Sequence, residues 1–245
     1  MKEKDLINYA KTSLNNTLEL DDNKISELAY EEIKSKKTIL EDVFLRFKNQ
    51  DKKAFFLFGG IGSGKTEFAN ALKKFYKIDF IEVDETKRYC KYYNGQNSDL
   101  FKKASLEGVN ILMNTVLDKE YSFILDGNFF KFIDSTLEKN YDVEVNFVYR
   151  PIETAKEYIK IIEKNESIKI SEDIFYKEFI NSINIVNKIK KKYLDIKVNF
   201  YDLHNDLILK DINNLDEVIN KSDVMQNDIK LAIERETENE NRYIK

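Results

Sequence analysis

Hydrophobic and polar positions follow two rhythms along this chain. Short apolar runs bounded by polar turns are typical of buried strands, and longer segments with an apolar residue every three or four positions are typical of amphipathic helices. The strand-like runs are Ala54–Phe58, Ile78–Val83, Tyr121–Leu125, Val143–Tyr149 and Lys197–Tyr201. The helical segments between them are 65–76, 99–118, 130–139, 152–164 and 172–193. This alternation predicts an α/β fold in which a parallel five-stranded sheet carries helices on both faces.

The two ends of the chain show the helical rhythm alone. In the first 50 residues, Leu40, Phe44 and Phe47 fall on one helix face, which predicts packing onto the domain that follows. The segment Thr38–Glu41 fits a capping box at the start of that helix. After about residue 205 the pattern is helical again. The expected units are a helical N-terminal extension at 1–50, a central domain at 51–206 and a helical C-terminal extension at 207–245.

Glycine is scarce in this chain, with 7 residues in 245, yet four glycines stand within Gly59–Thr66. This segment fits the pattern GxxxxGK[ST] and joins a strand-like run to a helical one, as a P-loop does. Main-chain N–H groups of such a loop surround phosphate oxygens, the lysine reaches the β- and γ-phosphates, and the threonine hydroxyl binds Mg²⁺. The predicted nucleotide-binding residues are Gly59, Gly60, Ile61, Gly62, Ser63, Gly64, Lys65 and Thr66. The chain is therefore expected to have a P-loop NTPase-type fold that binds ATP or GTP with Mg²⁺.

Carboxylates follow the second and third strand-like runs. Asp84 and Asp126 stand there, and in a parallel sheet these strand ends lie at the same edge as the P-loop. Asp84 could accept a proton from a substrate hydroxyl beside the γ-phosphate, and Asp126 could add a second contact to Mg²⁺. Two alternatives stay open, because Asp84 could instead cap the next helix and Asp126 could only form an Asp-Gly turn. A proton-accepting carboxylate favours a kinase over a motor ATPase or a GTPase.

Charge and composition exclude several classes of protein. The 40 basic and 44 acidic residues give a net charge of -4, so a global basic field for nucleic acid is missing. One cysteine and one histidine exclude an internal disulfide and a Cys/His zinc cluster. No apolar run approaches the ~18 residues of a membrane span, and the first residues do not form a signal peptide. We expect an intracellular, cytoplasmic protein with no nucleic-acid or membrane partner.

Four motifs in the central domain resemble the zeta toxin family of bacterial P-loop kinases. The likeness runs from about Ala54 to Asp206, and the P-loop alone would be generic. The motifs are Lys65–Phe68, Tyr93–Ser98, Phe123–Gly127 and Phe147–Pro151, and Tyr93–Ser98 together with Phe123–Gly127 makes the match specific. The resemblance implies a kinase that transfers the γ-phosphate of ATP or GTP to the 3′-hydroxyl of UDP-N-acetylglucosamine. It also implies the toxin of a toxin–antitoxin system, restrained by an antitoxin protein.

The resemblance also implies roles for individual residues. Asp84 takes the position of the general base, and Asp126 stands where many relatives have glutamate. Asn128 replaces a common threonine in the acceptor site. Asn94 and Asn97 offer donors suited to a sugar or a diphosphate, although an ordinary polar turn explains them equally well.

The segment after Pro151 departs from the family. Relatives carry lid arginines that stabilise the transferring phosphoryl group, and here one such position is Ile162. The other falls in 167–170, where Lys169 is the basic residue, so Lys169 is the expected catalytic cation. Arg88 and Arg150 lie near the predicted active edge and could substitute. Two other functions therefore stay open, a P-loop kinase for another hydroxyl and a catalytically weakened nucleotide-binding module.

Overall fold

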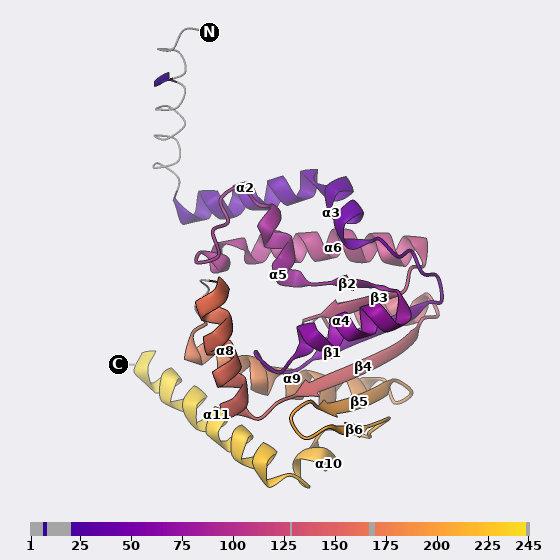
Figure 1. The fold of residues 1–245 in the computed structure, drawn as a ribbon, viewed down its shortest axis with the longest axis vertical. Helices are drawn as coiled ribbons and strands as arrows, with labels where there is room; N and C mark the ends of the chain where they lie inside the picture. The colour runs from indigo at the N-terminus through magenta and orange to yellow at the C-terminus, as the bar shows by residue number, and fades with distance from the viewer. Residues whose placement is uncertain (1–6, 9–20, 128, 167–169, 244–245) are drawn as a thin grey trace.

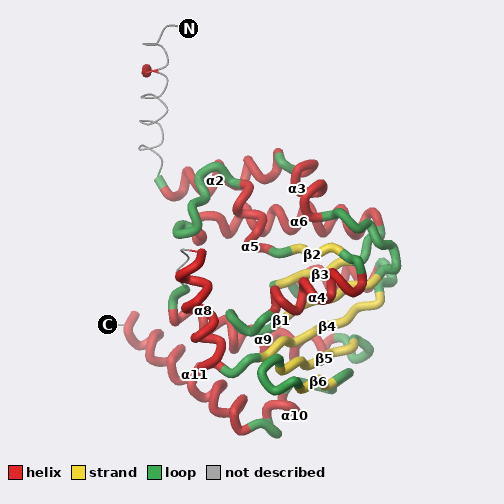
Figure 2. The backbone as a smooth tube through the Cα atoms, viewed as in Figure 1, coloured by secondary structure: helices red, strands yellow, loops and turns green. Residues whose placement is uncertain are grey.

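The centre of the protein is one mostly parallel sheet. The computed structural model describes residues 7–8, 21–127, 129–166 and 170–243. The sheet has six strands in the order β2-β3-β1-β4-β5-β6, and the first five of these are parallel neighbours (Figures 1 and 2). The strands are β1 (Lys53–Phe58), β2 (Asp79–Ile81), β3 (Phe123–Asp126), β4 (Asp142–Tyr149), β5 (Lys197–Asp202) and β6 (Leu207–Leu209).

Helices cover both faces of this sheet, as the alternation predicted. The α-helices are α2 (Asp22–Ser35), α3 (Lys37–Phe44), α4 (Lys65–Tyr76), α5 (Val83–Thr86), α6 (Lys102–Lys119), α7 (Lys131–Glu138), α8 (Ile152–Glu166), α9 (Glu172–Lys192), α10 (Asp216–Ile219) and α11 (Asp223–Tyr243). Two 3₁₀ turns, η1 (Lys87–Tyr89) and η2 (Ser98–Phe101), precede α6.

The strand β1 shows why the sheet needs cover on both sides. Its side chains alternate between faces, so that Phe55 and Leu57 pack with α4 while Phe56 and Phe58 join the larger cluster on the other face. That larger cluster contains the buried residues of α6 and α9 and extends into α2 and α3. Every residue from Ala54 to Phe58 is buried, which matches a central strand of a parallel sheet.

The prediction of five strands is wrong by one. A sixth strand, β6, pairs antiparallel with β5 through a hairpin. The Asp202 carboxylate closes that hairpin, because it accepts hydrogen bonds from the main-chain N–H groups of His204 and Asn205. The helical pattern expected after residue 205 is therefore wrong for Leu207–Leu209. Three residues on an exposed sheet edge are too few to show a period of two.

The N-terminal helices pack on the central domain, although their start was misplaced. Leu40 and Phe44 are buried as predicted, and α2 and α3 both contact α6. The proposed capping box is wrong, because α3 begins at Lys37 and Thr38 already lies inside it. Phe47 lies beyond the helix end and is 44% exposed. Asp21 is the N-cap of α2, and its side chain accepts a hydrogen bond from the Lys24 main-chain N–H at 2.7 Å.

Candidate functional site

The P-loop connects β1 to α4 at the carboxyl edge of the sheet. Gly59 has φ of 143°, and a Cβ there would lie 2.1 Å from the main-chain oxygen of Val148. Gly64 has φ of 97° and is the left-handed N-cap of α4. Both positions therefore require glycine for the loop to close between β4 and α4. The first turn of α4 points its positive end into this loop, which suits an anion.

Lys65 holds the loop in this conformation. Its ammonium group donates to the main-chain oxygens of Gly59 at 3.0 Å and Gly60 at 2.9 Å. The lysine thus lies across the loop whose N–H groups would surround phosphate. The Ser63 hydroxyl oxygen is buried and has no hydrogen-bond partner among the described residues. A phosphate oxygen at the loop would compete for the ammonium and could satisfy such polar groups.

A carboxylate cluster faces the P-loop threonine. The Thr66 hydroxyl donates to the Glu82 carboxylate at 3.4 Å. Burial, together with the neighbouring charges of Asp126, Glu85 and Asp84, raises the pKa of Glu82 to about 7. Burial also raises the pKa of Asp126, an effect that the nearby Lys65 ammonium opposes. The negative charge of Asp126 opposes ionisation of Glu82, and a cation at this cluster would relieve that repulsion.

The donor set at this cluster suits Mg²⁺. Asp126 Oδ1 is buried and has no hydrogen-bond partner within the described ranges. Thr66, Glu82 and Asp126 supply only oxygen atoms, the ligands that Mg²⁺ takes. Among the described residues, no group of three His, Cys, Asp or Glu side chains could hold a metal ion alone. The residues therefore fit an ion that takes most of its ligands from nucleotide phosphates and water, as Mg²⁺ does in kinases.

Asp84 lies in the first turn of a short helix and not, as the sequence pattern suggested, directly at the end of a strand. The strand β2 ends at Ile81, and Asp84 is in the short helix α5. Its side chain is 77% exposed and ion-pairs with Lys87. The interpretation of Asp84 as a helix cap is wrong, because the N-cap of α5 is Glu82 and no side chain of the described residues caps it. The carboxylate is thus accessible beside the P-loop edge.

Lys87 connects Asp84 to the segment Tyr93–Ser98. Its side chain is only 9% exposed, and its ammonium group donates to the Ser98 hydroxyl at 2.7 Å as well as to Asp84. No role for Lys87 could be predicted from the sequence, because a lysine in a polar turn carries no distinct signal. The fold therefore brings the proton-accepting candidate and the predicted acceptor segment together through one buried cation.

Asn94 and Asn97 organise the loop that contains them. The Asn94 side-chain oxygen accepts from the main-chain N–H groups of Gln96 at 3.0 Å and Asn97 at 3.1 Å. The Asn97 side chain accepts from Asn94 N–H at 3.1 Å and donates to the Tyr92 main-chain oxygen at 2.9 Å. Contact of either side chain with a substrate stays a prediction. Asn128 and Lys169, which were predicted for the acceptor and the lid, lie outside the described residues.

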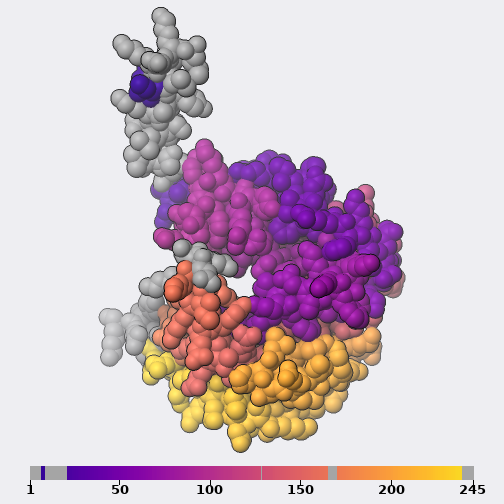
Figure 3. All heavy atoms as spheres, in the orientation of Figure 1, coloured from indigo at the N-terminus to yellow at the C-terminus, as the bar shows by residue number. Residues whose placement is uncertain are grey.

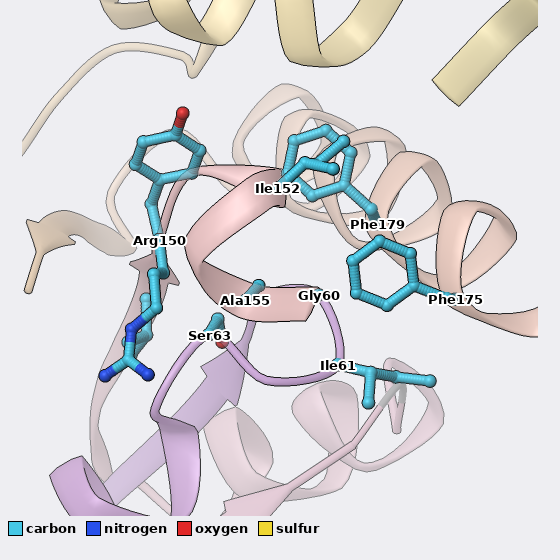
Figure 4. A pocket seen from close by; sticks show the side chains of 10 residues that line it. Gly60, Ile61, Ser63, Arg150, Ile152, Ala155, Phe175 and Phe179 are labelled. Carbon is cyan, nitrogen blue, oxygen red and sulfur yellow. The ribbon is translucent and has the colours of Figure 1, made fainter. Parts of the chain in front are cut away.

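The helix α8 lies against the P-loop. A Cβ at Gly62 would be 2.8 Å from the main-chain oxygen of Ala155 and 3.1 Å from the Ile159 side chain. Figure 4 shows α8 beside the loop, with Phe175 and Phe179 of α9 to the right of it. The apolar cavity among these groups measures about 10 Å³, so a nucleotide cannot enter there. Figure 3 shows the surface hollowed on the other side of α8, between it and the part of the chain that contains α4 and α5.

Arg150 is the described arginine that lies at the P-loop. A Cβ at Gly64 would be 3.3 Å from its Nη2 atom. Its guanidinium carbon lies 4.8 Å from the ring centre of Tyr158 on α8, and the Tyr158 hydroxyl donates to the Glu67 carboxylate on α4. Figure 4 shows the guanidinium pointing away from Phe175 and Phe179. Arg88, by contrast, pairs with Glu85 at 2.9 Å.

The chain matches a known protein family. The profile of the family described as Zeta toxin matches residues 36–214. No curated protein sequence matches the chain. The structure is similar to one from the PezAT chromosomal toxin-antitoxin system of the human pathogen Streptococcus pneumoniae. That likeness has a TM-score of 0.66 at 16% identity and covers 87% of this chain and 98% of the other.

A second similar structure is the native AvrRxo1-ORF1:-ORF2 complex. The TM-score is 0.50 at 14% identity, over 82% of this chain and 66% of that one. At such identities the likeness concerns the fold, which is that of P-loop kinase-like proteins. No helix within the described ranges is long and apolar enough to cross a membrane. The family profile spans the P-loop, the carboxylate cluster and α8, and this chain belongs to the Zeta toxin family.

Proposed function

We propose that this protein is a kinase that transfers the γ-phosphate of ATP or GTP to a hydroxyl group of a nucleotide sugar. The acceptor proposed from the family is the 3′-hydroxyl of UDP-N-acetylglucosamine. One observation carries the proposal. The P-loop lysine, the carboxylate cluster at Thr66, and Asp84 with its link to Ser98 all lie at one edge of the sheet. Donor site, metal site and proton acceptor are the parts that phosphoryl transfer needs.

The P-loop would bind the phosphoryl donor, ATP or GTP. Main-chain N–H groups of Gly60 to Lys65 would bind the phosphates, and the Lys65 ammonium would leave its two carbonyl partners for the β- and γ-phosphate oxygens. Thr66 and Asp126, with Glu82 beside them, would hold Mg²⁺. The ion would neutralise negative charge on the β- and γ-phosphates.

Asp84 would activate the acceptor hydroxyl. Its exposed carboxylate would accept the proton from the attacking hydroxyl, and the oxygen would then attack phosphorus in line with the leaving diphosphate. Lys87 holds the carboxylate beside Ser98, so the acceptor and the base would be positioned by the same loop. Arg150 is our candidate for the cation that stabilises the transferring phosphoryl group, because it lies at Gly64. Lys169 stays a second candidate from the sequence.

The proposal is tested by mass spectrometry of UDP-N-acetylglucosamine incubated with ATP, Mg²⁺ and the protein. We expect a product heavier by one phosphoryl group, formed by the wild type and not by Asp84→Asn. The matched control is Asp99→Asn, an exposed aspartate paired with Lys102 in the neighbouring turn, which should leave the product yield unchanged. If the wild type releases ADP with a different hydroxyl acceptor only, the sugar assignment is wrong and the kinase assignment stands.

A toxin role is proposed from the family and from the fold likeness to PezAT. Expression of the wild type should arrest bacterial growth, and the Lys65→Ala variant should not. An antitoxin partner should bind the wild type and prevent both growth arrest and turnover. Growth arrest by both forms alike would separate toxicity from phosphoryl transfer.

One observation favours a second candidate, a nucleotide-binding module with weakened catalysis. Ile162 stands at a family arginine position on α8, and an isoleucine cannot stabilise phosphoryl charge. This candidate predicts ATP binding without turnover for any UDP-sugar. Restoring arginine with Ile162→Arg should then produce measurable turnover, whereas the kinase proposal expects turnover already in the wild type.

A further inference from the structure

We propose that Asp228, on the C-terminal helix α11, is a positioning residue that holds the start of α8 and thereby aims Arg150 at the nucleotide. Asp228 lies outside the part of the chain that matches the family profile, which ends at residue 214. The inference rests on the proposed function in one respect, that Arg150 contacts the bound nucleotide.

Asp228 makes two hydrogen bonds to the turn between β4 and α8. Its Oδ2 atom accepts from the Tyr149 hydroxyl at 2.7 Å and from the Ile152 main-chain N–H at 3.0 Å. The residue is 8% exposed, and Tyr149 and Ile152 are buried as well. A buried carboxylate with defined partners costs more to displace than an exposed one, because moving it leaves polar groups unpaired.

The helix α8 cannot be capped by its own preceding residues. The Pro151 carbonyl accepts the first helical hydrogen bond, from Ala155 N–H at 2.9 Å, so Pro151 is the N-cap. Neither proline nor Arg150 has a side chain that accepts a hydrogen bond. Asp228 supplies the missing acceptor from 76 residues away, and its negative charge suits the positive end of α8.

Arg150 lies between the two residues that Asp228 binds. Tyr149 is held through its hydroxyl and Ile152 through its N–H group, while Pro151 restricts its own φ. The main chain at Arg150 is thus held on both sides. Its side chain reaches the P-loop at Gly64 and lies over the Tyr158 ring. Loss of the Asp228 contact would let the turn, and with it the guanidinium, move relative to the phosphates.

The helix α11 is itself firmly packed. Met225 and Ala232 are buried at 1% and 0% exposure, one turn before and one turn after Asp228, and α11 contacts α9. Asp228 therefore lies on a helix that packs firmly into the hydrophobic core. Burial raises the pKa of the Asp228 carboxyl, and the hydrogen bonds from Tyr149 and Ile152 oppose that shift.

The test compares Asp228→Ala with Met225→Ala in the full-length chain. Both variants should lower the melting temperature, because both remove a buried group from α11. Only Asp228→Ala should weaken binding of a non-hydrolysable ATP analogue, by about tenfold, the scale of one charge-assisted hydrogen bond. Asp228→Asn keeps an acceptor oxygen and should restore most of that affinity. Turnover measured in parallel should fall in kcat as well.

A double-mutant cycle with Arg150→Ala identifies the route of the effect. If Asp228 acts through Arg150, then Asp228→Ala should change the analogue affinity little in the Arg150→Ala background. Equal losses of affinity in Asp228→Ala and Met225→Ala, or fully additive losses in the cycle, would overturn the inference. If Arg150→Ala alone leaves binding and turnover at wild-type levels, the assignment of Arg150 in the proposed function fails and the inference falls with it. If Arg150→Ala weakens binding and Asp228→Ala does not, the inference about Asp228 is wrong and the proposed role of Arg150 stands.

Discussion

The P-loop and the turn that starts α8 both lie at the proposed nucleotide site, yet they are built in opposite ways. The P-loop is one continuous segment, Gly59–Thr66, whose glycines and lysine close it locally. The β4–α8 turn depends on Asp228, a residue far away in the sequence, and on the contact between Tyr158 and Glu67. The P-loop conformation therefore depends mainly on its own motif, whereas the β4–α8 turn depends on side chains from distant parts of the chain.

The largest expected effect concerns the acceptor side. Asp84→Asn should lower turnover by about 10²–10⁴-fold, because the amide cannot accept the proton from the attacking hydroxyl. ATP affinity should change little, since the Asp84 carboxylate is exposed and pairs with Lys87. Steady-state kinetics and calorimetry measure the two quantities. Loss of ATP binding in this variant would show that Asp84 helps to bind the nucleotide and is not specific to the acceptor.

Lys65→Ala should remove the cation of the P-loop itself. We expect turnover to fall by about 10²–10³-fold, the scale of one lost group that stabilises transition-state charge, and ATP binding to weaken as well. The fold should survive, because the hydrogen bonds of the Lys65 ammonium group go to loop carbonyls, those of Gly59 and Gly60. The control Lys73→Ala lies in the last turn of the same helix and should behave as wild type. Circular dichroism shows whether both variants are folded.

The carboxylate cluster should make stability depend on pH. The pKa of Glu82 is raised from 4.5 to about 7 in the folded protein, so the folded state holds a proton that the unfolded chain has lost between these values. Stability from this group is full below pH ~4.5 and is lost as pH rises through 7, by up to about 3 kcal/mol. Thermal unfolding from pH 5 to 8 measures it.

The variant Glu82→Gln should abolish most of that dependence and be the more stable form at pH 8. If the melting temperature of the wild type stays level over this range and equals that of Glu82→Gln, the pKa of Glu82 is not raised in the folded protein. Added Mg²⁺ with nucleotide should stabilise the wild type more than Glu82→Gln, because a cation relieves the repulsion in the carboxylate form.

The smallest effect is expected for the contact between α8 and α4. Tyr158→Phe removes one hydroxyl bonded to Glu67 and should cost about 0.5–1.5 kcal/mol of unfolding free energy. Turnover should change less than tenfold, because the ring under Arg150 remains. Tyr193→Phe is the matched control, since Tyr193 bonds Asp134 on the opposite side of the protein from α4. A loss of turnover as large as that of Lys65→Ala would make Tyr158 part of the donor site.

Local patterns predicted most elements because their causes are local. The helix expected at 65–76 is α4 with the same bounds, since a left-handed glycine starts it and the polar Lys77, with φ of 52°, ends it. Four of the parallel strands were predicted from short apolar runs, and β5 was predicted from the alternating pattern of Lys197–Tyr201. The features that the sequence pattern misplaced are very short or depend on where a neighbouring helix begins. The edge strand β6 has three residues, and Thr38–Glu41 matched a capping pattern inside a helix that began earlier.

The candidate site divides along the same line. Sequence alone determined the P-loop, the identity of Lys65 and Thr66, and the presence of carboxylates after two strands, because main-chain geometry and strand direction are local properties. Only the tertiary structure decided that Glu82 and not Asp84 contacts Thr66, that Lys87 joins Asp84 to Ser98, and that Asp228 holds the turn at Arg150. These contacts join side chains across helices and strands, and their geometry depends on how the elements pack. No spacing along the chain encodes it.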